Sequence, residues 1–245
     1  MFPIQTTVVS RHVPIATWLI IAVNSLVFFL EVGLSHEHLE QISYLFGVVP
    51  ARFTHPKWAE HVGFPLHVYW PFFTSMFLHG GLLHIVGNMW TLAVFGRNVE
   101  DQMGVARFLI FYLLCGIASG IVHVVINSDS TLPAIGASGA IAGVMGAYLV
   151  MFPRSRVIVM IPIFFFPFFF DFLAVLYLGY WFLLNFFSGV ASLTATSDTG
   201  GVAFWAHVGG FLTGILIFTF FLRSPDTRKK CHEDEGCIEH AWDRG

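Results

Sequence analysis

Polar side chains that could perform acyl transfer stand inside long apolar runs of this 245-residue chain: His84, Asn88, Ser138 and His207. A serine hydroxyl becomes a strong nucleophile when a base takes its proton, and a neutral imidazole within hydrogen-bond reach is the usual base. The oxyanion of the tetrahedral intermediate then needs hydrogen-bond donors, which an imidazole and an amide can supply. The pattern favours Ser138 as nucleophile, His207 as general base, and His84 with Asn88 as oxyanion donors.

Each of these residues also has an ordinary structural explanation. Ser138 belongs to GASGAIAG, residues 136–143, and a serine among small residues usually serves close packing of membrane helices. A histidine inside a membrane can be a structural hydrogen-bonding group or a proton relay, and an HxxxN pair can tie two helices together. Catalysis is therefore favoured only if these residues lie at the same depth, on helix surfaces that pack together, and with complementary chemical groups.

Membrane helices must position these residues, because the chain is 56% hydrophobic and only 11% charged, with 28 Phe and a mean hydropathy of +0.74. A helix that crosses the bilayer needs about 20 mostly apolar residues. Six segments qualify, so we expect an all-α polytopic membrane protein with spans at residues 13–32, 70–95, 105–126, 137–152, 168–188 and 202–222.

The approach to the fifth span is unusual. The segment VIVMIPIFFFPFFF contains Pro162 and Pro167, and proline interrupts helices. We interpret it as mainly an interfacial approach, with the fifth helix beginning near Phe168. This start places Asp171 near a helix end, where an ionisable group meets polar surroundings at lower cost.

The basic residues indicate which side each loop faces. Ten of the twelve Lys and Arg residues fall on the side of the two chain ends, and only Arg52 and Lys57 lie in the long first loop opposite. By the positive-inside rule, both termini are predicted to be cytoplasmic. We expect one membrane domain, residues 1–222, with an uncleaved first span, and a short solvated tail, residues 223–245. The tail residues Cys231, Cys237 and His240 match no closed zinc motif, so no metal site is predicted.

The serine and the second histidine are expected at the same depth. Their spans both run from outside to inside, so depth can be counted from the arginine at each inner end. Ser138 precedes Arg154 by 16 residues, and His207 precedes Arg223 by 16. At 1.5 Å per residue, both lie about 24 Å above their arginines, in the outer part of a hydrocarbon core about 30 Å thick.

Two glycine pairs indicate which spans touch. Gly139 and Gly143 form a GxxxG pair on the fourth span, and Gly210 and Gly214 form another on the sixth. Such pairs offer flat surfaces on which helix backbones approach closely. If the two surfaces meet, the serine and the imidazole face each other.

Four segments resemble, in order and spacing, the signature segments of the rhomboid family of intramembrane serine proteases: HGGLLHIVGNMW, GRNVEDQMG, GASGAIAGVMGAY and AHVGGFLTG. The resemblance covers residues 70–222 and, more loosely, the first span. It implies a six-transmembrane-helix rhomboid core. It also implies that the fifth helix and the loop 189–201 form a lateral gate and cap for substrates.

The resemblance gives each candidate residue a role. Ser138, in the GxSG motif that begins at Gly136, corresponds to the nucleophile, and His207 to the base of a dyad without a carboxylate. His84 and Asn88 correspond to the oxyanion site, and the glycines correspond to structural positions.

Two positions depart from the family pattern. Some relatives carry an aromatic residue one turn after the nucleophile that stacks on the base, but this chain has Ala142 there, so the orientation of His207 is open. Certain bacterial members carry a Trp-Arg pair in the first loop, and Arg52 in VVPARF is the nearest candidate here.

The predicted reaction is hydrolysis of a peptide bond in or beside the transmembrane helix of another protein, among membrane lipids and without nucleic acid, cofactor or metal. The short termini and six spans favour a prokaryotic plasma membrane, and no feature specifies an oligomeric state. Two alternatives stay open: a non-catalytic binder of membrane helices with the same fold, and a small transporter. Against the transporter, the hydropathy pattern shows no clear inverted repeat.

Overall fold

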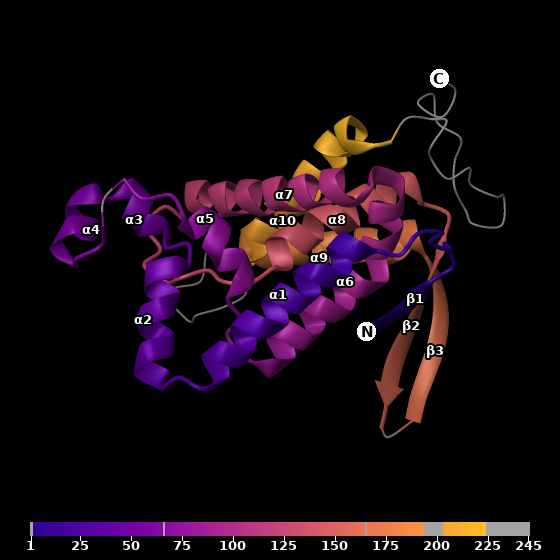
Figure 1. The fold of residues 1–245 in the computed structure, drawn as a ribbon, viewed down its shortest axis with the longest axis horizontal. Helices are drawn as coiled ribbons and strands as arrows, with labels where there is room; N and C mark the ends of the chain where they lie inside the picture. Colours follow the sequence, from indigo (N-terminus) through magenta and orange to yellow (C-terminus); the bar gives the residue numbers. More distant parts are fainter. Residues whose placement is uncertain (1, 66, 165, 194–202, 224–245) are drawn as a thin grey trace.

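The computed structural model describes residues 2–65, 67–164, 166–193 and 203–223, which form a mostly helical bundle with a small sheet at one end (Figure 1). The helices are α1 Ile15–Val32, α2 His36–Phe46, α3 Pro50–Thr54, α4 Pro56–His61, α5 Pro71–Thr74, η1 Ser75–Phe77, α6 Leu82–Met103, α7 Val105–Ile126, α8 Ser138–Met151, α9 Ala174–Ser192, α10 Phe204–Ile217 and η2 Phe218–Phe221. The strands are β1 Phe2–Thr6, β2 Arg156–Ile163 and β3 Phe166–Leu173.

Within the described ranges, four helical segments are long and apolar enough to cross a membrane by themselves: α1, α7, α9 and Phe204–Phe221. The pair Pro71–Phe77 and Leu82–Met103 passes the same test only when joined, and the chain bends by 96° between its two parts. The expectation of one continuous helix over residues 70–95 is therefore wrong. The helix α8 is apolar but short. This set of helices makes the chain a polytopic integral membrane protein.

The segment before the fifth helix is a β-hairpin and not part of a helix. Strands β2 and β3 pair antiparallel, with Pro162 opposite Pro167, and β1 adds to β2 to complete a three-stranded sheet. The all-α expectation is wrong here, because β-branched and aromatic residues favour strands and the prolines exclude a helix. The helix α9 begins at Ala174 and not near Phe168, and Asp171 lies exposed in β3, opposite Ile158.

The helix α8 forms the centre of the bundle and is buried along almost its whole length. Its neighbour α10 approaches it at the glycine pairs. A Cβ atom built on Gly210 would lie 2.0 Å from the carbonyl oxygen of Gly139, and one on Gly214 would lie 1.9 Å from that of Gly143. The two backbones are therefore in direct contact, and any side chain at these positions would separate the helices.

The segment GRNVEDQMG at the end of α6 holds the start of α1. The carboxylate of Glu100 accepts hydrogen bonds from the backbone N–H groups of Ala16 and Thr17, at 2.9 and 2.8 Å. Asp101 accepts one from the backbone N–H of His12 at 3.1 Å. Because the first N–H groups of a helix lack intrahelical partners, the buried Glu100 caps α1, while Asp101 holds the segment that precedes it.

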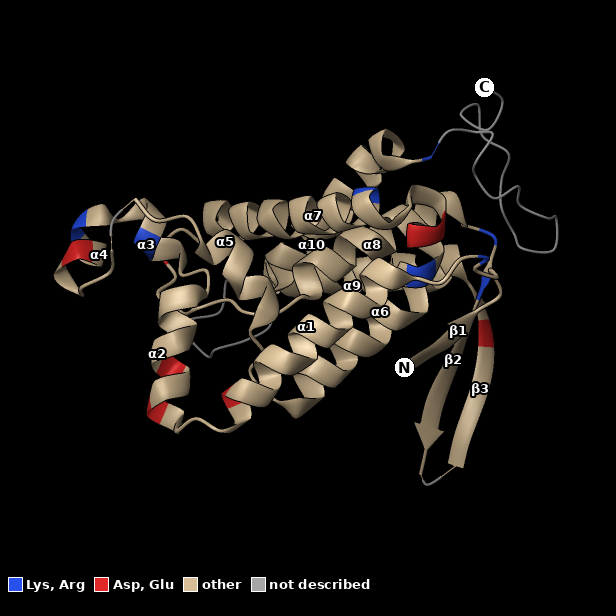
Figure 2. Cartoon of the chain, viewed as in Figure 1, with Lys and Arg blue, Asp and Glu red and all other residues tan. Residues whose placement is uncertain are grey.

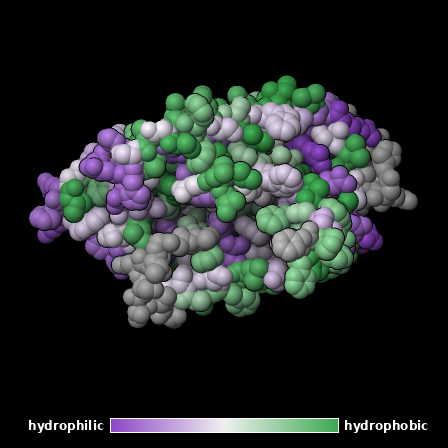
Figure 3. Space-filling model, turned by 90° about the horizontal axis from the view of Figure 1, so that it is seen from below, coloured by the Kyte–Doolittle hydropathy of each residue, from purple (hydrophilic) through white to green (hydrophobic). Residues whose placement is uncertain are grey.

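Charge and hydropathy divide the molecule along its length. Basic residues gather mostly at the end that carries the β-strands, and the others lie at the opposite end in α3 and α4 (Figure 2). Hydrophobic residues spread across the middle of the face in Figure 3, whereas hydrophilic residues gather toward its two ends. This arrangement suits a bundle whose middle lies in lipid and whose ends meet water.

Arg52 organises the long first loop. Its side chain is buried, and its guanidinium donates hydrogen bonds to the carbonyl oxygens of Leu45 and Pro65, at 3.1 and 3.4 Å. The guanidinium also lies over the rings of Phe53 and Phe64. Arg52 thus joins α2 to the segment that follows α4.

Candidate active site

The loop before α8 sets the position of Ser138. Ala134 pairs with Val48 of the first loop in an isolated β-bridge, and the backbone N–H of Gly136 donates to the carbonyl oxygen of Ser75 at 2.8 Å. Gly136 has a φ of +125°, which a residue with a side chain rarely adopts. Ser138 then becomes the first residue of α8. A helix of 14 residues is about 21 Å long, which is shorter than the hydrocarbon core of a bilayer, about 30 Å thick.

The structure brings Ser138 and His207 together. The distance from Oγ of Ser138 to Nε2 of His207 is 2.8 Å, and His207 is buried on the first turn of α10. The glycine contact between α8 and α10 makes this approach possible. Ser138 lies one residue before Gly139 on α8, and His207 lies one turn before Gly210 on α10.

Two residues of α9 orient the imidazole from the other side. Oδ1 of Asn185 lies 2.7 Å from Nδ1 of His207. The amide nitrogen of the same asparagine donates to the carbonyl oxygen of Trp181 at 2.8 Å, so its oxygen must face the imidazole. The indole of Trp181 packs on the imidazole, with ring centroids 5.7 Å apart. Nδ1 of His207 therefore carries a proton, and Nε2 is left to accept the hydrogen bond of the Ser138 hydroxyl.

His84 and Asn88 lie on one face of α6 against the turn that precedes Ser138. A Cβ atom on Gly136 would lie 2.7 Å from Nε2 of His84 and 3.6 Å from Nδ2 of Asn88. Nδ1 of His84 accepts a hydrogen bond from the backbone N–H of Gly80 at 3.4 Å, which leaves the ring proton on Nε2. Nδ2 of Asn88 is buried without a hydrogen-bond partner within the described part of the chain. Two unused donors thus point toward the N-terminus of α8.

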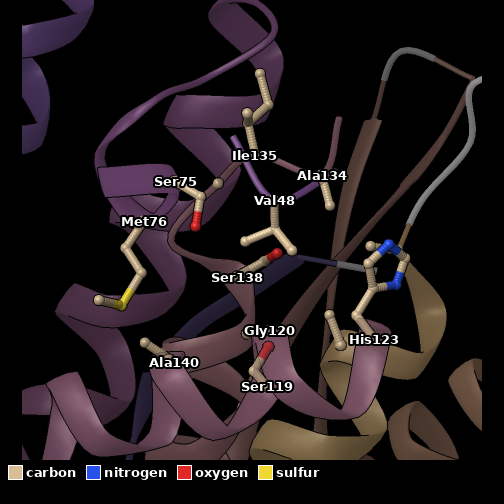
Figure 4. A pocket seen from close by; sticks show the side chains of 15 residues that line it. Val48, Ser75, Met76, Ser119, Gly120, His123, Ala134, Ile135, Ser138 and Ala140 are labelled. Atoms are coloured by element: carbon tan, nitrogen blue, oxygen red, sulfur yellow. The ribbon is translucent and has the colours of Figure 1, made fainter. Parts of the chain in front are cut away.

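A pocket opens beside the Ser138 hydroxyl (Figure 4). Polar groups in its wall come from Ser75, Ser119 and His123, and Met76 lies among the apolar residues. The other three candidate residues, His84, Asn88 and His207, are not among its lining residues. The pocket therefore adjoins the serine on a side that the imidazole does not occupy.

Several polar residues near the site escape sequence reasoning. Asn185 is a lone amide in the apolar α9, and the rule that intramembrane polar groups are functional candidates could have found it. His79 is buried with both ring nitrogens unpartnered within the described ranges, and its ring lies 5.1 Å from that of His84. His123 faces the pocket from α7. The sequence shows each of these polar residues in or beside an apolar segment. Only the fold shows that they lie near the candidate site.

Comparison with known proteins finds relatives in plants, bacteria and animals. The mitochondrial RHOMBOID-like protein 6 of Arabidopsis thaliana is 30% identical over 158 residues, which are 64% of this chain and 45% of that protein. Rhomboid protease GluP of Bacillus subtilis (strain 168) is 31% identical over 153 residues, 62% of this chain and 27% of that protein. The mitochondrial presenilin-associated rhomboid-like protein of Homo sapiens is 29% identical over 160 residues, 61% of this chain and 37% of that protein.

The matched region spans less than half the length of each of these relatives. A family profile, that of the Rhomboid domain, matches residues 66–224, which include α6, α8 and α10 with all four candidate residues. By this match over more than half of its length, the chain belongs to the rhomboid family.

Proposed function

We propose that this rhomboid protein is an intramembrane serine protease that cleaves peptide bonds in or next to the transmembrane helix of other membrane proteins. The observation that carries the proposal is the 2.8 Å contact between Oγ of Ser138 and Nε2 of His207, with the imidazole oriented to accept the hydroxyl proton. The relative from Bacillus subtilis is named a rhomboid protease, which agrees with this activity.

The reaction follows from the arrangement of these groups. Oγ of Ser138 attacks the substrate carbonyl carbon while Nε2 of His207 takes the hydroxyl proton. Nε2 returns the proton to the leaving amine, and an acyl-enzyme forms on Ser138. A water molecule then attacks the acyl carbonyl while the same nitrogen takes its proton. As the bond to Ser138 breaks, Nε2 returns this proton to Oγ, and the second product leaves.

The developing oxyanion is stabilised by donors at the start of α8. The backbone N–H of Ser138 belongs to the first turn, where N–H groups have no intrahelical partner. Nε2–H of His84 and the amide of Asn88 add side-chain donors next to Gly136. Removal of one such donor costs about 3–4 kcal/mol of transition-state stabilisation in other acyl-transfer enzymes.

The proposal includes six membrane crossings within residues 1–222. The four long spans, the bent pair of α5 and η1 with α6, and the short α8 supply them. By the positive-inside rule, the end of the bundle where most basic residues gather is then the cytoplasmic one (Figure 2), and both termini are expected on that side. The tail 224–245 lies outside the described residues, as does most of the loop 189–201 that we expect to cap the site beside α9.

The compartment stays a prediction. Relatives named mitochondrial stand beside the bacterial one, so membership of the family does not assign the compartment.

A reporter substrate tests the activity. The full chain, reconstituted in lipid vesicles with a single-span reporter protein, should cleave it within or near its span. We expect Ser138→Ala and His207→Ala each to abolish cleavage while the protein remains folded and inserted. Full cleavage by either variant would remove the assignment. Binding of the reporter without cleavage by the native chain would identify the non-catalytic binder instead.

A further inference from the structure

The amide of Asn185 is fixed in one orientation by its own helix. Its nitrogen donates to the carbonyl oxygen of Trp181, which can only accept. If the amide were turned around, its oxygen would face the carbonyl oxygen of Trp181 and this hydrogen bond would be lost. Oδ1 of Asn185 therefore faces Nδ1 of His207 at 2.7 Å, and this contact requires a proton on Nδ1.

The alternative tautomer would disable the dyad. With its proton on Nε2, the imidazole would present an N–H to the Ser138 hydroxyl and could not take the hydroxyl proton. Within the described residues, Asn185 is the polar group that contacts Nδ1 of His207. The acceptor on Nδ1 thus decides whether Nε2 acts as a base.

The helix that carries this acceptor is only lightly packed. Of the 19 residues of α9, those that are buried are Ala174, Leu178, Asn185 and Gly189. Near the site, α9 contacts α10 through ring packing of Phe182 on Phe211, at 5.0 Å, and through the indole N–H of Trp205, which donates to Gly189 at 3.1 Å. An outward shift of α9 by about 1 Å would stretch the contact of Asn185 with His207 past the limit of a hydrogen bond.

We propose that Asn185 is a positioning residue that keeps Nδ1 of His207 protonated, and that it thereby makes the base depend on the docking of α9 against α10. Displacement of α9 withdraws the acceptor and leaves His207 free to take the inactive tautomer. This inference rests on the proposed function. It adds that the tautomer of His207 is controlled by α9, a helix that carries neither Ser138 nor His207.

Substitution of Asn185 tests the first part, with the full chain in lipid vesicles. In Asn185→Leu, which lacks the acceptor, we expect kcat and the rate of Ser138 labelling by a fluorophosphonate to fall by about 10²-fold, with KM little changed. Asn185→Asp keeps an acceptor and should retain turnover at alkaline pH. Its carboxylate favours the protonated ring, so the acidic limb of its pH–rate profile should move to higher pH.

A double-substitution cycle tests the dependence on α9. Phe182→Ala loosens the packing of α9 on α10 without touching Asn185, and we expect it to slow labelling of Ser138 in the native background but not in the Asn185→Leu background. The matched control is Phe187→Ala on the same helix, because Phe187 is 64% exposed and should leave the labelling rate unchanged.

The outcomes separate this inference from the proposed function. Native turnover and an unshifted pH profile in the Asn185 variants, with Ser138→Ala inactive, would overturn the inference and leave the protease intact. Equal slowing by Phe182→Ala in both backgrounds would overturn the dependence on α9. Turnover that survives Ser138→Ala would overturn the proposed function itself.

Discussion

Ser138 and His207 are 69 positions apart in the sequence, yet their reactive atoms lie 2.8 Å apart in the fold. Their types and matched depths made this meeting predictable, because polar groups are rare in membrane spans and depth follows from residue number. Asn185 is also a polar residue inside an apolar helix, but the sequence did not indicate that it contacts His207. Which face an apolar helix turns inward depends on its packing, and α9 is apolar along almost its whole length.

The orientation of the imidazole also depends on the fold. Ala142 stands where some relatives carry a stacking aromatic residue, and the sequence offered no substitute. Trp181 packs on the ring from α9 instead. The aromatic contact is thus supplied by a different helix, 39 residues further along the chain, and no local motif could show it.

Asn88→Ala tests the oxyanion assignment at the residue scale. The unpartnered amide of Asn88 is one of several donors at the start of α8, so its loss should lower kcat by about 10²-fold and leave residual turnover. Asn24→Ala is a suitable control, because the Asn24 amide donates to Ile20 of its own helix. A kcat for Asn88→Ala equal to that of the native chain would take Asn88 out of the oxyanion site.

At the scale of elements, the contact between α8 and α10 was readable from glycine spacing, whereas the hairpin was not. Two GxxxG pairs specify a flat surface on each helix, and these surfaces meet. The segment before α9 is a continuous apolar run, and such a run has no periodicity that would distinguish a helix from a strand. Its prolines indicate that a helix cannot continue there, but they do not indicate which structure forms instead. In the fold, β2 pairs with β3 and also with β1, which comes from the other end of the described chain.

Gly210→Ala should separate the two central helices. Its Cβ would lie 2.0 Å from the Gly139 carbonyl oxygen, so α10 must move away and carry His207 from Ser138. We expect the free energy of unfolding to fall by about 1–3 kcal/mol and cleavage of the reporter to be largely lost. Gly179→Ala on α9 meets nothing within 4 Å and should leave both quantities unchanged. Native activity in Gly210→Ala would show that the close approach is dispensable.

The hairpin is still predicted to lie at the membrane interface, as its Phe-rich composition indicates. Phe166, Phe168 and Phe169 are exposed in β3, and the strand leaves the bundle at the end where basic residues gather (Figure 2). A nitroxide attached at position 169 should collide with oxygen more readily than with a water-soluble nickel complex. The control is the charged, exposed position of Lys57 in α4, where we expect the reverse. Equal nickel accessibility at both positions would place the hairpin in water.

At the scale of the whole molecule, composition and charge were sufficient to predict a polytopic membrane protein. The apolar middle and polar ends of the bundle agree with it (Figure 3). The number of continuous spans was harder to predict, because the bent pair, when joined, passes the same test of length and composition as a straight span, and the short α8 is also apolar. In the proposed arrangement of six spans, the short α8 would place the Ser138 hydroxyl inside the bilayer, and water would have to reach it from one side.

The most direct test of the account is covalent labelling of the membrane-embedded protein by a fluorophosphonate, with the modified residue located by mass spectrometry. Activation of Ser138 by His207 predicts an adduct on Ser138 in the native chain, no adduct in Ser138→Ala and strongly slowed labelling in His207→Ala. A native chain that stays unlabelled, or labelling that is as fast without His207 as with it, would contradict the account.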